Sequence, residues 1–135
     1  MCQVLVLVNP LILPILMPAS IKQVALQTID LEARAVSGLA AYINDDFEKT
    51  VRVIAGGRGR VVVSGIGKSA VIAQKIVATF NSTGTPSLFM HAADAIHGDL
   101  GMIQEDDVVI LISKSGESPE IKVLVPLLKN FGNHL

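Results

Sequence analysis

Hydroxyl and glycine residues gather in one short stretch of the sequence, Ser113-Lys114-Ser115-Gly116-Glu117-Ser118. The stretch follows an apolar run expected to be a strand, and Pro119 after it suits the first turn of a helix. Hydroxyl groups and backbone N–H groups at a helix N-terminus donate hydrogen bonds to the terminal oxygens of a phosphate monoester. The pattern therefore indicates a phosphate site, although a helix N-cap with spare serines would explain the same residues.

A second small-residue turn stands earlier in the chain, in the stretch Gly65-Ile66-Gly67-Lys68-Ser69-Ala70. It follows residues 61–64, which are mostly valine and fit a strand buried on both faces. A helix predicted over 69–80 begins directly after it, so the first N–H groups of that helix lie above the strand end, where they suit an anion. Two such turns above one sheet favour a ligand site over capping alone.

The glycine turn also permits other interpretations. Its Lys-Ser pair suggests a nucleotide P-loop, but Val62 stands where that motif needs a glycine, so this interpretation fails. The G-x-G-x-x-A spacing fits a dinucleotide fold with Asp94 at roughly the required distance, which would indicate an NAD-dependent oxidoreductase. The glycines could also serve only the packing of a tight turn.

Several titratable side chains follow the expected strands and could move protons: Lys68, His91, Asp94, His97, Glu117 and Glu120. Each by itself is explained more simply as a solvated charge or a capping partner, and the helix dipole alone favours Glu120 in a first helical turn. A metal site would require four side chains to converge, namely His91, Asp94, His97 and Asp99. Nothing in their spacing demands this, so we expect no metal.

Composition limits the class of protein. The chain has 135 residues, 50% of them hydrophobic, which suffices for one modest domain. Its net charge of −1, from 11 basic and 12 acidic residues, gives no electrostatic footprint for nucleic acid or an anionic membrane. Cys2 is the only cysteine, which excludes an intrachain disulfide and agrees with a reducing compartment. We expect a cytoplasmic protein with a small anionic ligand.

Periodicity and turn signals predict the order of elements. Helices are expected over about 20–43, with Ser20 as N-cap, and over 47–54, 69–80 and 119–129; strands are expected over 61–64, 87–90 and 107–112. Residues 91–101 are expected to form a polar loop. Alternating strands and helices predict an α/β fold, a three-layer sandwich with a parallel sheet. Because another strand is due after residue 135, we expect the domain to be incomplete at its C-terminus.

Residues 1–16 carry no charged side chain and are interrupted by Pro10 and Pro14. They lack the basic region of a signal peptide, and they are short and proline-broken for a transmembrane span. An apolar contact strand across an oligomer interface is a further interpretation. We favour an extraneous extension with Met17 as the natural start, because a helix signal begins straight after it. The expected domain is therefore 17–135.

Two longer stretches carry a resemblance to a known family: SGIGKSAVIAQKIVATFNSTGTPSLFMHAADAIHGDLGMI and DVVILISKSGESPEIKVLVPLLK. Together with the helical lead, residues 20–130 resemble the sugar isomerase (SIS) domain, and within it the arabinose-5-phosphate isomerases of the KpsF/GutQ group. The resemblance implies a Rossmann-like fold with a five-stranded parallel sheet. It also implies a homo-oligomer, a tetramer or dimer, that interconverts ribulose 5-phosphate and arabinose 5-phosphate without a redox cofactor.

Carried over by position, the resemblance implies substrate-binding roles for Gly65, Gly67, Ser69, Asp94, Ser113, Ser115, Gly116, Glu117 and Ser118. The serines would hold the phosphate, and the glycine turn would border the sugar. Lys68, His97 and Glu120 match catalytic positions. Moving a carbonyl between C1 and C2 needs a base at carbon and stabilisation of the enediolate charge, which Glu120 and Lys68 could supply.

The chain also departs from that family. Asp94, Lys114 and Ala70 stand where its members usually carry Glu, Asn and Gly. Those members continue through further strands that bring another Glu and a His to the site, and usually through two CBS domains, which are absent here. A non-catalytic sugar-phosphate-binding module therefore remains an alternative to an enzyme, and the dinucleotide pattern keeps the oxidoreductase as a second.

Overall fold

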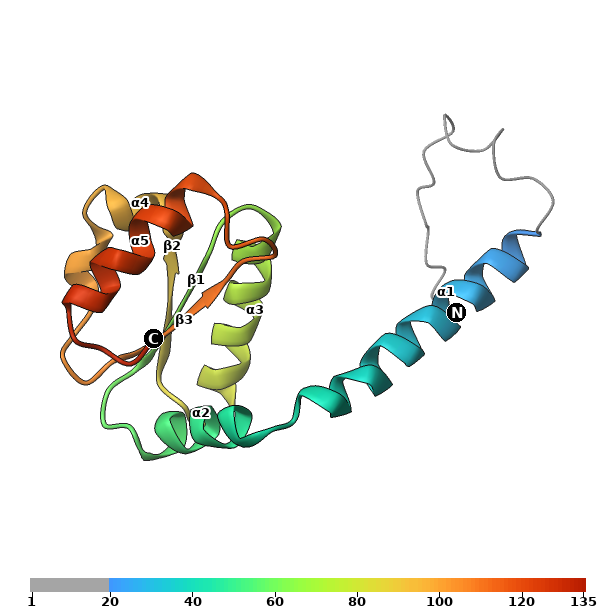
Figure 1. Cartoon of the computed structure of the whole chain (residues 1–135), viewed down its shortest axis with the longest axis horizontal. Helices are drawn as coiled ribbons and strands as arrows, with labels where there is room; N and C mark the ends of the chain where they lie inside the picture. The colour runs from blue at the N-terminus through green and yellow to red at the C-terminus, as the bar shows by residue number, and fades with distance from the viewer. Residues whose placement is uncertain (1–19) are drawn as a thin grey trace. The chain divides into compact units, whose positions relative to one another are not determined.

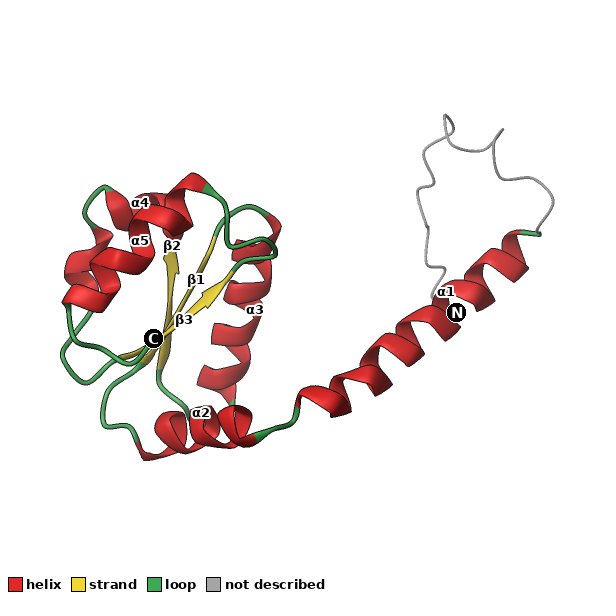
Figure 2. Cartoon of the chain, in the orientation of Figure 1, coloured by secondary structure: helices red, strands yellow, loops and turns green. Residues whose placement is uncertain are grey.

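A computed structural model describes residues 20–135, shown along the chain in Figure 1 and by element type in Figure 2. The chain divides into two compact units, Met1–Asp45 and Asp46–Leu135. The interpretations of residues 1–16, and of Met17 as a start, lie outside the described residues.

The described part of the first unit is helical. Helix α1 (Ile21–Gly38) is followed by the short 3-10 helix η2 (Leu39–Tyr42). Ser20 is the N-cap of α1, as predicted: its Oγ accepts from the Gln23 N–H at 3.2 Å, and the Gln23 side chain accepts from the Ser20 N–H at 2.7 Å. None of the α1 side chains is buried. The apolar spacing therefore predicts the helix correctly but does not identify what its apolar side chains contact.

No helix within residues 20–135 combines the length and the apolar character that crossing a bilayer would require.

The second unit is built on a parallel sheet of three strands in the order β2-β1-β3. The strands are β1 (Val61–Gly65), β2 (Ser87–His91) and β3 (Val108–Ile112). Gly65 at the end of β1 stands opposite His91 and Ile112 at the ends of its two neighbours. The predicted parallel sheet is confirmed, and all three carboxyl ends meet at one edge.

Helices cover both faces of this sheet, as Figure 1 shows. Helices α2 (Asp45–Gly56) and α3 (Lys68–Ser82) contribute to the core on one face, with Val61 and Val63 of β1. Helices α4 (Ala92–Ile96) and α5 (Pro119–Asn130) pack on the other face, with Val62. Because both faces are covered, β1 is apolar at consecutive positions instead of alternate ones.

Residues 91–101 differ from the loop that the sequence analysis expects. They contain α4 and the 3-10 helix η3 (Asp99–Met102). Ala92 and Ala95, three positions apart on α4, are buried in the core with Met90 and Leu124. A five-residue helix offers too few apolar positions for its periodicity to be recognised among polar neighbours.

A buried ion pair joins the starts of β1 and β3. The Asp107 carboxylate, only 1% exposed, accepts hydrogen bonds from the Arg60 side chain at 2.6 and 3.2 Å and from the Arg60 backbone N–H at 2.8 Å. It also accepts from the Gln104 N–H at 2.9 Å. Burial would raise the pKa of Asp107, but these hydrogen bonds and the Arg60 charge hold that pKa below its usual value.

The backbone at this junction is packed too closely for a side chain. A Cβ added to Gly59 would lie 2.2 Å from the Asp106 carbonyl oxygen and 2.6 Å from the Asp107 nitrogen. Both are backbone atoms and cannot rotate away. Gly59 therefore allows the chain entering β1 to contact the chain entering β3.

We expect Asp107→Asn to lower the free energy of unfolding at pH 7 by about 2 to 3 kcal/mol, because it leaves the Arg60 charge without its partner. This is below the loss for a fully enclosed pair, since about a third of the Arg60 side chain, 32%, reaches solvent. The folded state lowers the Asp107 pKa, so its contribution is complete above the unfolded pKa of about 3.9 and is lost as the pH falls through the folded pKa.

Urea unfolding at pH 7 and in acid would measure this effect. The stability gap between the wild type and Asp107→Asn should shrink as the pH falls. Asp106→Asn, at an exposed neighbouring carboxylate, is the matched control and should change stability by less than about 0.5 kcal/mol. Equal losses for the two variants would contradict the assigned role of Asp107.

Candidate functional site

The carboxyl edge of the sheet brings together the two small-residue turns that the sequence analysis singled out. β1 continues through the glycine turn into α3, while the adjacent strand β3 continues through residues 113–118 into α5. The two helices then cover opposite faces of the sheet. Chains that leave neighbouring strand ends in opposite directions open a crevice between them, which is where ligands bind in open α/β sheets.

Gly65 and Gly67 shape the turn after β1 for different reasons. A Cβ on Gly65 would lie 2.9 Å from the Ser69 carbonyl carbon, so this glycine lets α3 start directly against the strand. Gly67 has φ 57° and ψ −127°, a conformation that side chains rarely adopt, and it is the N-cap of α3. Packing therefore accounts for Gly65, and the turn leaves Lys68 exposed at the helix start.

The serine loop, residues 113–118, is organised by its own hydroxyl groups. Ser113 Oγ accepts from the Gly116 N–H at 3.0 Å, and Ser115 Oγ accepts from the Glu117 N–H at 3.2 Å. Gly116, at φ 70°, makes the turn between them. Each of these hydroxyls still has its own proton to donate to a ligand.

Ser118 is the N-cap of α5 but makes no side-chain capping hydrogen bond. Capping therefore does not explain this hydroxyl, which was the plainer interpretation of the sequence. A serine that stands at a helix N-terminus without closing its first turn can donate to an anion bound there. Among the three serines of the loop, Ser118 is the one whose hydroxyl makes no hydrogen bond to a loop or helix amide.

The charged candidates occupy two neighbouring regions of this edge. Glu120 lies in the first turn of α5 and is partly buried, beside the serine loop. Glu117 of the serine loop forms an ion pair with Lys122 of α5. The region that follows β2 holds Asp94 in α4, whose Oδ2 lies 3.7 Å from His91 Nδ1, and the exposed His97, the C-cap of α4.

The structure thus places Lys68, Ser69 and the serine loop at adjacent strand ends, with Asp94 and His97 on the other side of β1. A dinucleotide fold would have its ribose-binding carboxylate at the end of β2. Asp94 lies beyond that end, in α4. Within residues 20–135, no three His, Cys, Asp or Glu side chains are grouped so that they could hold a metal ion.

The sequence analysis missed one polar group near this edge. Ser64, the residue before Gly65, is fully buried, and its hydroxyl makes no hydrogen bond to any described residue. It stands opposite Met90 and Leu111 in the sheet. A serine that continues a valine strand gives no signal in the sequence, so only its burial draws attention to it.

We expect Ser118→Ala to change the free energy of unfolding by less than about 0.5 kcal/mol, because its hydroxyl closes no helical turn. Gly116→Ala in the same loop should cost about 1 to 2 kcal/mol, because alanine is strained at positive φ. Chemical unfolding of the two variants in parallel would compare them. A loss of stability in Ser118→Ala as large as that in Gly116→Ala would show that Ser118 is structural.

Comparisons with known proteins agree with this geometry. The family model of the SIS domain matches residues 56–135. The arabinose 5-phosphate isomerase KdsD of Pseudomonas aeruginosa is 54% identical over 108 residues, which are 80% of this chain and 33% of that protein. The arabinose 5-phosphate isomerase GutQ of Escherichia coli K12 is 48% identical over 104 residues, which are 77% of this chain and 32% of that protein.

A solved structure, that of an Escherichia coli CFT073 protein in complex with arabinose 5-phosphate, superposes with a TM-score of 0.76 at 44% identity. The match covers 86% of this chain and 63% of that chain. The present chain spans about a third of the length of the curated relatives it matches. Because the family model matches more than half of its residues, and its turns follow adjacent strands of a parallel sheet, the chain belongs to the SIS domain family.

Proposed function

We propose that this chain forms the sugar-phosphate site of an aldose–ketose isomerase that interconverts D-arabinose 5-phosphate and D-ribulose 5-phosphate. The observation that carries this proposal is the serine loop, which lies at the carboxyl edge next to the turn bearing Lys68. Relatives named arabinose 5-phosphate isomerases, and a similar structure solved with arabinose 5-phosphate, support the choice of substrate.

The phosphate would bind at the serine loop. Ser113 and Ser115 accept hydrogen bonds from backbone amides of the loop and still have hydroxyl protons to donate. The Ser118 hydroxyl makes no capping hydrogen bond. The N-terminus of α5 adds its partial positive charge, which favours a dianionic phosphate. The sugar would then extend toward Lys68 and Ser69 at the start of α3, with the glycine turn beside it.

Isomerisation moves one proton between carbons and another between oxygens. In the direction from the aldose, we assign Glu120 to take the proton from C2 and return it to C1, while the proton on O2 passes to O1. His97 is our candidate for the transfer between the oxygens. Lys68, the first residue of α3 and exposed there, would stabilise the negative charge of the enediolate.

We further propose a homo-oligomeric, cytoplasmic protein in which residues 17–135 belong to the SIS domain. The exposed apolar side chains of α1, such as Ile29 and Val36, at 62% and 67% exposure, support contact with a second copy. The balanced charge supports the expectation that neither nucleic acid nor membrane is a partner.

A non-catalytic sugar-phosphate-binding module is the second candidate. It would use the same serine loop to bind the phosphate, without the proton transfers. The NAD-dependent oxidoreductase has less support. Gly65 is explained by the packing of α3 against β1, and Asp94 lies in α4 beside His91.

Calorimetric titration of the full chain would test the binding site. We expect saturable binding of arabinose 5-phosphate and none of NAD. Ser118→Ala should weaken binding by about tenfold or more, because a hydrogen bond to a charged group contributes about 1.5 to 3 kcal/mol. Ser82→Ala, which removes a hydroxyl at the far end of α3, is the control and should leave the affinity unchanged. Binding of NAD instead of the sugar phosphate would overturn the proposal in favour of the oxidoreductase.

Isomerase activity separates the enzyme from the binding module. For an enzyme, Glu120→Gln should reduce turnover by about 100-fold or more, which is the low end for a general base. Its affinity for arabinose 5-phosphate should stay within about threefold, because the phosphate contacts remain. Turnover can be followed from the ribulose 5-phosphate formed. Near-normal turnover in Glu120→Gln would refute its assigned role, and binding without turnover in the wild type would favour the binding module.

A further inference from the structure

The hydroxyl groups of the serine loop are neutral donors. The Gly116 and Glu117 amides already donate to Ser113 Oγ and Ser115 Oγ, at 3.0 and 3.2 Å, so the loop offers a ligand mainly its hydroxyl protons. A phosphate monoester carries a charge of about −1.5 to −2 at pH 7. Glu120 in the first turn of α5 adds a negative charge beside it. A dianion at this loop therefore needs a positive charge nearby, in addition to the partial charge of the helix N-terminus.

Lys114 stands in the middle of the serine loop, between Ser113 and Ser115, and is exposed. It forms no ion pair with any residue between 20 and 135. Lys122, the next lysine along the chain, is paired with Glu117, so those two charges offset each other. Lys114 therefore gives the loop one uncompensated positive charge.

The position of Lys114 in the chain keeps this charge close to a ligand on the serines. Its Cα atom lies about 3.8 Å from the Cα atoms of Ser113 and Ser115, as for any neighbouring residues. A flexible four-carbon stem carries the ammonium group. A phosphate held by these serines thus lies at a distance comparable with the Debye length, about 8 to 10 Å at 0.1 to 0.15 M salt, whichever rotamer the lysine adopts.

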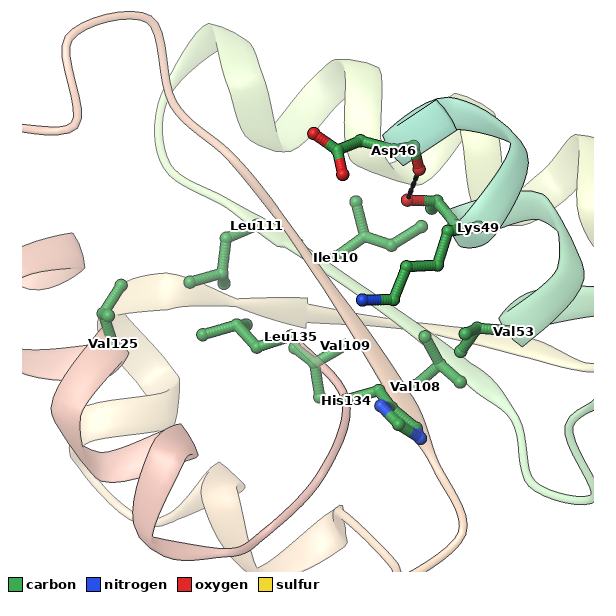
Figure 3. A pocket seen from close by; sticks show the side chains of 11 residues that line it. Asp46, Lys49, Val53, Val108, Val109, Ile110, Leu111, Val125, His134 and Leu135 are labelled. Atoms are coloured by element: carbon green, nitrogen blue, oxygen red, sulfur yellow. Dashed lines mark hydrogen bonds between the residues drawn. The ribbon is translucent and has the colours of Figure 1, made fainter. Parts of the chain in front are cut away.

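Other lysines are placed differently. Lys68 begins α3, where the proposed function has it beside the sugar. In Figure 3 the Lys49 side chain extends from α2 toward a cavity of about 640 Å³ beside β3. Val109 and Val125 are among the described residues that line this cavity, and none of them belongs to the serine loop. Lys114 is the lysine whose place in the chain suits the phosphate.

We propose that Lys114 determines specificity at the phosphate site: its charge favours a dianionic phosphate monoester over a monoanionic ligand of similar shape. This inference rests on the proposed function, because it takes the serine loop as the place where the phosphate binds. The attraction acts through charge and not through a fixed hydrogen bond. It is therefore strong at low salt and screened at high salt.

Calorimetric titration of the full chain with arabinose 5-phosphate tests the inference. It is done at about 0.01 M salt, where the Debye length is about 30 Å, and at about 1 M salt, where it is about 3 Å. At low salt, Lys114→Gln should weaken binding about three- to fivefold, as expected for one positive and two negative charges near the protein surface. At high salt the affinities of the wild type and the variant should agree within about 1.5-fold.

Two further variants separate charge from shape. Lys114→Arg keeps the charge and should retain both the affinity and the salt dependence of the wild type. Lys129→Gln removes the same charge from an exposed position in the last turn of α5, and should change the affinity by less than about 1.5-fold, because it lies about 16 Å along the helix from the serine loop. Circular dichroism would establish that all three variants fold.

A monoanionic ligand tests the preference itself. The methyl ester of arabinose 5-phosphate carries one negative charge on its phosphate group. At low salt, the preference for arabinose 5-phosphate over this ester should be about twofold smaller in Lys114→Gln than in the wild type, because the interaction energy scales with the ligand charge.

Equal binding of arabinose 5-phosphate by Lys114→Gln and the wild type at low salt would overturn this inference and leave the proposed function standing. An equal loss at both salt concentrations would overturn it too, since a lost contact and not a lost charge would then be the cause. An unchanged preference over the methyl ester would have the same consequence. No binding of arabinose 5-phosphate by the wild type would refute the proposed function, and this inference with it.

Discussion

The pairing of Arg60 with Asp107 is the interaction on which the arrangement of this domain depends. It joins the residue before β1 to the residue before β3, and Gly59 permits the close approach that it needs. A buried carboxylate without such partners would be costly, so other alignments of the two strands are disfavoured. In this register Gly65 stands opposite Ile112, and the turns that follow both strands start at the same level. An interaction at the amino end of the sheet thereby positions the candidate ligand-binding groups at the carboxyl end.

At that end, the groups available to a ligand are those that the fold itself does not use. Ser113 and Ser115 accept hydrogen bonds from backbone amides of their own loop, and Glu117 forms an ion pair with a lysine of α5. The Ser118 hydroxyl makes no capping hydrogen bond, and Lys68 is exposed at the start of α3. Side chains that contribute least to folding are the ones most available to a substrate. Ser118 and Lys68 both stand at helix N-termini, where an anion is favoured.

Much of this domain could be predicted from sequence alone. Consecutive valines, small-residue turns and Pro119 at a helix start specify local conformation, and local conformation depends on nearby residues. The strands, the longer helices, the Ser20 cap and the family followed from such signals. The five-residue helix α4 was not predicted, because its two buried alanines form too short a pattern.

Tertiary structure alone decided which of these residues meet. Strand order and the faces taken by α3 and α5 depend on contacts between distant parts of the chain, such as Arg60 with Asp107, 47 positions apart. For the same reason the sequence does not reveal that the Ser64 hydroxyl is buried or that the Ser118 hydroxyl makes no capping hydrogen bond. The sequence determined the local elements and the phosphate-binding chemistry available to them, while long-range packing determined which groups remain free to carry it out.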